Sequence, residues 1–549
     1  MRYRLTFFIL LTFIAGSGYS QTQTVGLFFN DSLAYNGYTL FAPMNHRHVY
    51  LIDNCGYQVQ SWSCGNHNSH MAYLLEDGSL LRTGVIQSYH FQAGGRCGLV
   101  DCYSWEGDLL WEFEYHAEEY HQHHDVEPLP NGNFLMIVWE KYSPQEAVNM
   151  GKDPLYISDE LWMESIMEVD PGEGEIVWEW KSVDHLIQDY DPTKENYGVV
   201  ADHPGKIDIN YTDDPNPATN TDWLHVNSVE YNAVLDQVLI SPRNYSEIWI
   251  IDHSTTTEEA AGSSGGIYGK GGDLLYRWGN PEAYDRGGED DQMLRYMHDP
   301  AWIPADYIDG GKISVFNNED SYQQSSVVVF DPPQDSPGVY TDPGDDSYGP
   351  VSYDWIYAGE ELFSSAISGA QRLPNGNTLI CEGRGGIFTE VTYEEKELVW
   401  KYRCPVNIFG RISQGSTPHD ISQFKILRYG PDYPGLEGKD LIPGDPVELD
   451  PWAYDCTIYG DTSTYIGTNN EGVNIKVINP FRDELVIYSD ALIGSKLLVY
   501  NMQGALMVKM RLSSTRETVD TYTWPAGTYL LKAEGPDLLF ISMMIIKIN

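Results

Sequence analysis

The chain has 549 residues, of which 42% are hydrophobic and 13% aromatic, and its formal net charge is −47. This length predicts several domains or one large repeat architecture, and the apolar content excludes a chain that is disordered by composition. The negative charge argues against nucleic acids and anionic membrane surfaces as partners.

Residues 1–20 have the pattern of a secretory signal peptide. Arg2 and Arg4 precede an apolar run from Leu5 to Ala15, and small residues follow up to Ser20. The run is too short to span a bilayer, and no later segment is long enough. We therefore expect an exported protein without a membrane span, cut near Ser20.

A weak repeat extends over residues 21–455. Hairpin turns with Asp-Gly or Asn-Gly lie in 74–84, 129–139 and 373–383, and these dipeptides tolerate the positive φ that tight hairpins need. Short aromatic strands recur in 57–62, 107–115, 174–180, 272–279, 353–359 and 396–402. Six similar β units predict an all-β, six-bladed β-propeller, with an insertion at 141–171.

The chain changes character after Asp455. Residues 456–471 are polar and predict a linker, and 472–549 contain alternating strands of a length that suits a small immunoglobulin-like β-sandwich. This segment resembles a type IX secretion C-terminal sorting domain, through Asn479-Pro480-Phe481, Val499-Tyr500-Asn501 with Gly504, and Pro525-Ala526-Gly527-Thr528-Tyr529. The resemblance implies recognition by the type IX secretion machinery and a secreted or cell-surface location. An ordinary adhesion-type sandwich is the alternative.

Seven cysteines are expected in an oxidising compartment, where disulfides are permitted. Cys97–Cys102 and Cys55–Cys64 are the nearest pairs, but spacing does not determine the pairing, and an odd number leaves at least one cysteine without an intrachain partner. Acidic stretches such as 342–349 could bind calcium. None has the spacing of an EF-hand loop, so solvated loops are the simpler interpretation.

Four places combine histidine or arginine with a setting that suggests a site. They are His124 in HQHHD (121–125), His225 in 222–229, Arg243 in 239–252 and His298 in HDPAW (298–302). Each histidine precedes an apolar run that we interpret as the inner strand of a blade, whose end loops would face a central funnel. The pattern therefore predicts one shared site, with His121 and His123 as loop residues.

These motifs resemble the bacterial arylsulfate sulfotransferase family over roughly residues 24–425. The resemblance is carried, in the family's order, by 37–62, HHDVEPLPNGN, DWLHVNSVEY, the arginine strand, HDPAWIP and SGAQRLPNGNTLI. It implies a six-bladed propeller that moves a sulfuryl group from a phenolic sulfate donor to a phenol acceptor through a sulfated histidine. Such an enzyme needs neither a nucleotide sulfate donor nor another cofactor. Pro242 before Arg243 is a departure from the family pattern.

The resemblance also implies roles for individual residues. His298 matches the sulfated nucleophile, His124 and His225 the flanking histidines, Asn227 an asparagine that donates to sulfate, and Arg243 an arginine eighteen residues after His225. A family threonine falls at Ser365 or Ser368. The residue types suit the chemistry, because a neutral imidazole is a nucleophile near neutral pH and a guanidinium can bind two sulfate oxygens.

Three other interpretations stay open at this point. HQHHD offers ligands for zinc or copper, although His123 and His124 would point to opposite faces of an extended strand. A secreted propeller could instead bind glycans or proteins without catalysis. Hydrolysis of a sulfate ester cannot be separated from transfer, but the sulfatase motifs C-x-P-x-R and S-x-P-x-R are absent.

Overall fold

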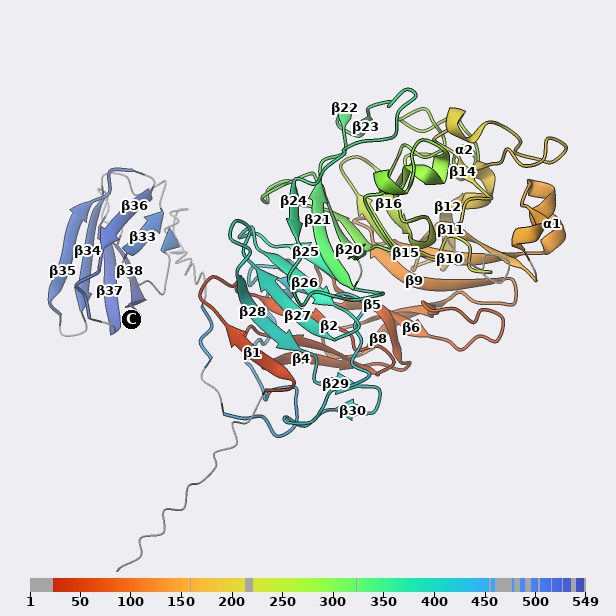
Figure 1. The fold of residues 1–549 in the computed structure, drawn as a ribbon. Coiled ribbons are helices and arrows are strands. Elements are labelled where there is room, and N and C mark those ends of the chain that lie inside the picture. The colour runs from red at the N-terminus through yellow and green to blue at the C-terminus, as the bar shows by residue number, and fades with distance from the viewer. Residues whose placement is uncertain are drawn as a thin grey trace, which may run out of the picture.

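A computed structural model describes residues 23–549 except 158, 213–220, 322, 454–455, 460–475, 478–483, 489–494, 502–503, 515, 526, 535–539 and 548–549. The expected signal peptide and most of the expected linker lie outside the described residues. The described chain is mostly β, with many four-stranded antiparallel sheets and two short α-helices (Figure 1). No helix in this part of the chain is long and apolar enough to cross a membrane.

Six antiparallel sheets follow one another between residues 26 and 429. The first three contain β31 (Leu427–Tyr429), β2 (Tyr38–Phe41), β3 (His48–Ile52) and β4 (Gln58–Ser63); β5 (Asn68–Leu74), β6 (Leu80–Val85), β7 (Gly98–Tyr103) and β8 (Leu109–Glu114); and β9 (Tyr120–Pro128), β10 (Phe134–Tyr142), β11 (Leu161–Asp170) and β12 (Glu175–Lys181).

The next three sheets have the same strand order, and the last gains a fifth strand from the N-terminal region. They contain β15 (Val226–Asn232), β16 (Gln237–Pro242), β17 (Ile248–Asp252) and β18 (Tyr276–Trp278); β19 (His298–Trp302), β20 (Ile313–Ser321), β21 (Gln324–Phe330) and β24 (Trp355–Tyr357); and β25 (Gly369–Arg372), β26 (Thr378–Glu382), β27 (Ile387–Val391), β28 (Leu398–Arg403) and β1 (Gly26–Asn30).

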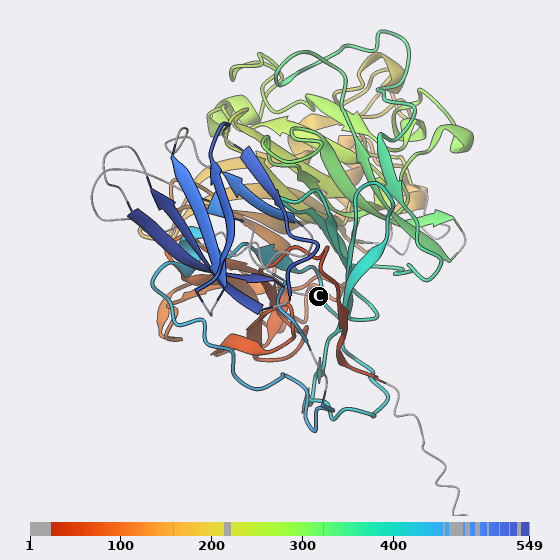
Figure 2. The same cartoon turned by 90° about the vertical axis from the view of Figure 1, so that its left-hand side faces the viewer.

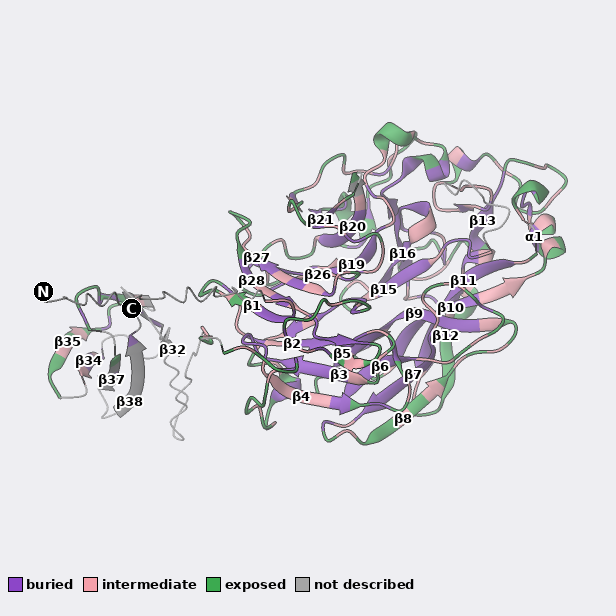
Figure 3. Ribbon diagram, turned by 60° about the horizontal axis from the view of Figure 1, so that its bottom comes forward, coloured by how far each residue is buried: buried purple, intermediate pink, exposed green. Residues whose placement is uncertain are grey.

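The first strands of successive sheets lie against one another. Strand β5 contacts β9, β9 contacts β15, β15 contacts β19, and β19 contacts β25. First strands are more buried than fourth strands. Strand β9, the first strand of the third sheet, is mostly buried, whereas β8, the fourth strand of the second sheet, is largely exposed (Figure 3). The predicted hairpin turns at 74–84, 129–139 and 373–383 each join a first strand to a second one.

The six aromatic segments expected from the sequence all contain the fourth strand of a sheet. Tryptophans on five of these strands donate an Nε1–H to a backbone carbonyl of the next sheet, at 2.7–2.9 Å. The pairs are Trp62–Ser104, Trp180–Gly272, Trp278–Pro350, Trp355–Tyr393 and Trp400–Asn54. Between the second and third sheets, Trp111 stacks on Phe134. The Trp400 bond connects the sixth sheet to the first.

Two expectations about these sheets are wrong. The apolar run after each histidine is the second strand, as in β10, and the histidines lie on or directly before the first strand, as in β9. The insertion is also shorter than 141–171, because β10 continues to Tyr142 and β11 begins at Leu161. Helix α1 (Pro144–Met150) lies between them, with a capping box made by Ser143 and Glu146.

Smaller elements cover the sheets. They are helix α2 (Thr257–Ala260) and the two-stranded pairs β13 (Leu186–Ile187) with β14 (Ile207–Asp208), β22 (Gln334–Ser336) with β23 (Val339–Tyr340), and β29 (Val406–Asn407) with β30 (Gly410–Arg411).

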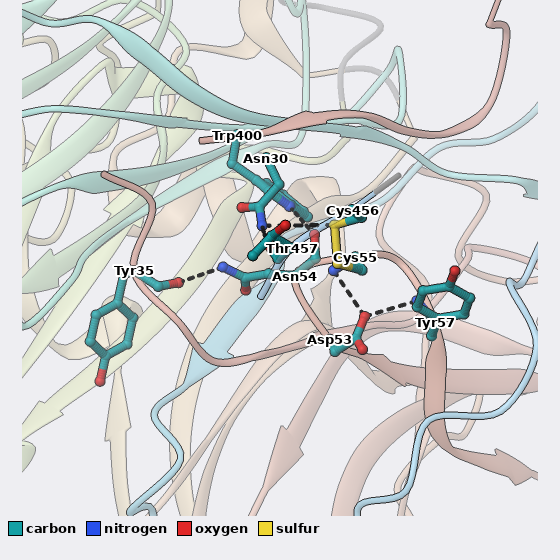
Figure 4. Close-up of a disulfide and its surroundings, with 9 residues drawn as sticks. All are labelled: Asn30, Tyr35, Asp53, Asn54, Cys55, Tyr57, Trp400, Cys456 and Thr457. Carbon is teal, nitrogen blue, oxygen red and sulfur yellow. Dashed lines mark hydrogen bonds between the residues drawn. A yellow bond between two sulfur atoms is a disulfide. The ribbon is translucent and has the colours of Figure 1, made fainter. Parts of the chain in front are cut away.

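Strands from the two ends of this region complete the first and last sheets. Strand β31 pairs with β2, and β1 pairs with β28. A disulfide between Cys55 and Cys456 joins residues 401 positions apart beside these closures (Figure 4). The turn that carries Cys55 is held by Asp53, whose carboxylate accepts from the N–H groups of Cys55 and Tyr57. The other five cysteines are free and buried, so neither sequence-adjacent pair forms.

The C-terminal region contains two further sheets (Figure 2). One holds β32 (Lys476–Val477), β33 (Glu484–Tyr488) and β36 (Arg516–Asp520), and the other holds β35 (Leu506–Arg511), β34 (Lys496–Asn501), β37 (Gly527–Glu534) and β38 (Phe540–Lys547). One apolar cluster includes Leu485 and Val519 from the first sheet and Val499 and Leu531 from the second. The motif 479–481 lies outside the described residues.

We expect the Cys456→Ser variant to lose about 2–4 kcal/mol of unfolding free energy, because the disulfide closes a very long loop in the unfolded chain. Chemical denaturation of the wild-type protein and the variant, each with and without reductant, would measure the loss. Reductant should lower the wild-type midpoint to that of the variant and leave the variant unchanged. Equal midpoints for the two oxidised proteins would contradict the prediction.

Candidate active site

The three predicted histidines lie where the first strands of three sheets are interrupted by bulges. The registers shift between His123 and Val126 on β9, between Val226 and Val229 on β15, and between His298 and Ala301 on β19. His124 and His225 have φ values of 52° and 51°, which are uncommon outside glycine. A bulge with such backbone geometry redirects the side chain of a strand residue, and bulges are frequent next to active sites.

The sequence predicts that His121 and His123 are loop residues. This prediction is wrong, because both are buried residues of β9. His123 stacks on Trp139 with a centroid separation of 3.8 Å. The two neighbouring histidines also do not point to opposite faces, because Nδ1 of His123 lies 2.8 Å from Nδ1 of His124. The positive φ of His124 breaks the alternation that a regular strand would impose.

The histidines form one cluster. The rings of His124 and His225 are 4.6 Å apart, and the rings of His124 and His298 each lie 6.2 Å from that of Phe424. Burial, then the charge of Arg243, holds the pKa of His298 well below its usual value, and His225 adds to the effect. Residues from three sheets and from the segment before β31 therefore meet at one place.

His298 presents an unprotonated Nε2. Its Nδ1 lies 2.7 Å from Oδ1 of Asn318, and Nδ2 of Asn318 donates to the carbonyls of Ser364 and Ile367. The amide oxygen of Asn318 must therefore be an acceptor, which assigns the proton of the neutral ring to Nδ1. The Nε2 lone pair accepts from the N–H of Ile367 at 3.1 Å.

His225 is held by a carboxylate. Its Nδ1 lies 2.5 Å from Oδ2 of Asp222, whose other oxygen accepts from Nε1 of Trp139 at 3.0 Å. The carboxylate fixes the ring orientation and favours a proton on Nδ1. Asp222 was not predicted as a site residue, although its position three residues before His225 in the quoted DWLH motif was an available signal.

The hydrogen bond between His123 and His124 shows which nitrogen of His124 carries the proton. Nε2 of His123 is fully enclosed and has no partner among the described residues. An enclosed N–H without an acceptor is costly and rare, so we place the proton of His123 on Nδ1, where it is donated to Nδ1 of His124. The proton of the neutral His124 ring is then on Nε2.

Arg243 begins a 3₁₀ turn (Arg243–Tyr245) directly after β16. Its Nη1 donates to Oδ1 of Asn244 at 3.1 Å, and its guanidinium lies 4.6 Å from the ring centroid of Tyr296. Its backbone N–H donates to the carbonyl of His225. These contacts place the guanidinium close enough to His298 to lower the pKa of that imidazole.

Asn227 is fully buried on β15. Its Nδ2 donates to the carbonyl of Met297 at 2.8 Å, and its Oδ1 accepts from Oγ of Ser241 at 2.5 Å. The contact with Met297 connects β15 to the residue directly before His298. Through these bonds Asn227 helps to position β19, the strand that begins with His298.

The two serine candidates differ in their surroundings. Ser365 is exposed, whereas Ser368 is buried and its Oγ accepts from the N–H of Gly383 at 2.9 Å. The group from this segment that reaches His298 is the backbone N–H of Ile367. A backbone N–H has no sequence signature as a hydrogen-bond donor to a site, so this contact could only be found in the structure.

A buried lysine, Lys425, contacts the aspartates that follow two of the histidines. Nζ of Lys425 is 2.9 Å from Oδ1 of Asp299 and 3.5 Å from Oδ2 of Asp125, and these aspartates directly follow His298 and His124. Burial raises the pKa of Asp125 to about 6 even though Lys425 lowers it. Burial alone would lower the pKa of Lys425, but the two carboxylates raise it above its usual value.

The described residues contain no group of three or more His, Cys, Asp or Glu side chains placed to hold a metal ion. The adjacent histidines of HQHHD instead bond to each other and stack on Trp139.

A family model for arylsulfotransferases (ASST) matches residues 44–409, which include all five predicted site residues. The chain belongs to the arylsulfotransferase family. Membership suggests that the protein is a sulfotransferase that acts on aryl sulfates. No curated protein matches this chain.

Solved structures resemble this chain only distantly. A protein of unknown function from Bacteroides caccae is 12% identical, with a TM-score of 0.38, and covers 72% of this chain and 100% of its own. The Cps50 (Swd1) β-propeller domain of Myceliophteria thermophila is 9% identical, with a TM-score of 0.34, and covers 75% of this chain and 94% of its own.

We expect Lys425→Met to cost about 3–5 kcal/mol of stability, because it leaves two buried carboxylates without their cation. The folded-state pKa of Asp125, which burial already raises to about 6, should rise further. A carboxyl whose pKa is raised by folding binds more protons in the folded state, so stability falls as pH rises from about 4 through the folded pKa.

Denaturant titrations across this pH range would therefore find the variant closest to wild type at the acid end. Lys270→Met, at an exposed position, is the matched control and should differ little from wild type at any pH. A Lys425→Met deficit that does not depend on pH would argue against the ion pairs.

Proposed function

We propose that this protein transfers a sulfuryl group from an aryl sulfate to a phenol, with His298 as the covalent carrier. The observation that carries the proposal is the protonation pattern of His298. Its Nδ1–H is donated to Asn318, its Nε2 is unprotonated, and Arg243 and His225 are close enough to lower its pKa. A neutral imidazole whose reactive nitrogen is fixed next to a guanidinium suits attack on an anionic ester.

In the first half-reaction, Nε2 of His298 forms a bond to sulfur while the bond from sulfur to the phenolic oxygen breaks. The reaction should resemble phosphoryl transfer, with charge spread over the equatorial oxygens. Arg243 and the Nε2–H of His124 are the donors that would meet this charge. The N–H of Ile367 must release the Nε2 lone pair, and it then lies beside the transferred group.

His225 supplies the proton in the first half-reaction and removes one in the second. When protonated on Nε2, it donates a proton to the departing phenolate, and Asp222 stabilises the protonated ring. In the second half-reaction the neutral ring removes the proton from the acceptor phenol, whose oxygen attacks sulfur and frees His298. One residue serves both steps because the leaving group and the acceptor are chemically alike.

We also propose that the six sheets close into a six-bladed propeller. The serial contacts of the first strands, the tryptophan bonds between neighbouring sheets and the bond from Trp400 to Asn54 support a closed ring. Closure explains how residues from β9, β15 and β19 meet, because in a propeller such strands surround one axis.

The location of the protein is a further proposal. The expected signal peptide and the motifs within 472–549 support export and recognition by the type IX secretion machinery, followed by release or surface attachment. The apolar cluster shared by the two C-terminal sheets is compatible with a small sandwich in that role.

Mass spectrometry of the protein mixed with 4-nitrophenyl sulfate, without an acceptor, tests the covalent step. We expect one added sulfuryl group on His298, which is removed when phenol is supplied. His298→Ala should acquire none, and Asn227→Asp, which alters only the positioning amide, should acquire it more slowly.

An unmodified wild-type protein that releases no nitrophenol would reject the proposal for this class of donor. A non-catalytic propeller that binds glycans or proteins would then be the better description. A protein that becomes sulfated and discharges at the same rate with and without phenol would be a hydrolase.

The pH dependence of the first half-reaction tests the state of His298. Since burial and Arg243 keep its pKa well below 6.5, the ring stays neutral and nucleophilic in mildly acidic solution. With 4-nitrophenyl sulfate, whose leaving group needs little protonation, we expect the sulfation rate to show no acid limb near about pH 6.5. A sulfation rate that falls below about pH 6.5 in the wild type, with a midpoint that shifts in the Arg243→Gln variant, would mean that the pKa of His298 lies near its usual value.

A further inference from the structure

A fourth histidine borders the cluster and has no role in the mechanism above. His70 is on β5, inside the bulge between Asn68 and Ala72, so the first strand of the second sheet has the same interruption as β9 and β19. Its ring is 5.2 Å from that of His124 and 4.9 Å from that of Phe424. The sequence analysis did not single out this residue.

Ser69 determines which nitrogen of His70 carries the proton. Oγ of Ser69 lies 2.6 Å from Nδ1 of His70 and 2.8 Å from the carbonyl of Arg96. The single hydroxyl proton must go to the carbonyl, because two facing oxygen acceptors would otherwise repel each other. Oγ then accepts the Nδ1–H of His70, and burial, which lowers the pKa of the ring to about 3, keeps Nε2 unprotonated.

The free nitrogen of this ring is not fully enclosed, although His70 as a whole is buried. Within the part of the chain that the structure describes, Nε2 of His70 has no hydrogen-bond partner, yet it is not among the fully enclosed polar atoms without partners. Both ring nitrogens of His121 and Nε2 of His123 do belong to that enclosed set. His70 is therefore built as an accessible acceptor, whereas His121 is sealed in the core.

The rings of His70 and His124, which both lie near Phe424, thus carry opposite hydrogen-bonding groups at Nε2. The first offers a lone pair and the second an N–H. A phenolic hydroxyl can satisfy both, since it donates one hydrogen bond and accepts another. We propose that His70 recognises the hydroxyl group of the acceptor phenol as it binds, before this single hydrogen turns to the neutral His225 ring that removes it. This inference rests on the proposed function and names a residue that determines its acceptor specificity.

The same geometry makes His70 indifferent to the donor. An aryl sulfate ester has no hydrogen to donate from its bridging oxygen, and an imidazole lone pair offers nothing to its anionic oxygens. With 4-nitrophenyl sulfate as donor, whose leaving group needs little protonation, the contribution of His70 is therefore confined to the second half-reaction. This separation distinguishes a recognition role from a purely structural one, which would affect both half-reactions.

The test compares wild type with His70→Phe and His70→Gln in separate half-reactions. Sulfation of His298 by 4-nitrophenyl sulfate should proceed in all three proteins at similar rates. Discharge of the sulfated protein by phenol should become about tenfold less efficient in kcat/KM for His70→Phe, through loss of one hydrogen bond to the hydroxyl. His70→Gln retains an acceptor oxygen near the position of Nε2 and should recover most of the loss.

His121→Phe is the matched control, because it makes the same substitution at a sealed histidine and should change neither half-reaction. Equal discharge rates for wild type and His70→Phe, with sulfation intact, would overturn the inference and leave the proposed function standing. Slower sulfation in His70→Phe would also overturn it in favour of a structural role. Absence of sulfation in the wild type would reject the proposed function itself.

Discussion

The ammonium group of Lys425 lies between two carboxylates, and each carboxylate follows a histidine of the site. Asp125 also accepts from the N–H of Val229, and Asp299 from the N–H of Ala370, so the same two side chains bind strands β15 and β25. Lys425 in turn belongs to the segment that supplies Phe424, the ring around which the histidines gather. One buried cation therefore fixes the relative positions of strands from several sheets.

This arrangement requires unusual backbone at the strand starts. A regular strand would send His124 and its neighbours alternately to the two faces of the sheet, and only part of the cluster could form. The bulges and positive φ values cost free energy, which the surrounding sheets offset through their packing. The tryptophan bonds between neighbouring sheets supply part of that rigidity, since each one joins an indole N–H to a backbone carbonyl of the adjacent sheet.

The sequence predicted the repeated features of the fold better than its local exceptions. Hairpin dipeptides and aromatic strands were located correctly because their signals depend on neighbouring residues only. The assignment of the apolar runs to the first strands was wrong because hydrophobicity reports burial, and second strands such as β10 are buried on both faces. The Cys55–Cys456 pair joins the ends of the repeat region, and only the closed structure brings these ends together.

The site residues were predicted through a resemblance, and their roles depend on partners that the resemblance did not name. Asn318 sets the proton of His298, Ser69 that of His70, and His123 that of His124. Each partner is an ordinary polar residue at no distinctive spacing, so its effect appears only when hydrogen-bond directions are followed through the folded chain. Those directions give similar imidazoles the different hydrogen-bonding groups on which the proposed roles of nucleophile, donor and acceptor depend. In a protein with a formal charge of −47, an anionic substrate also depends on local positive charge, which Arg243 supplies beside the nucleophile.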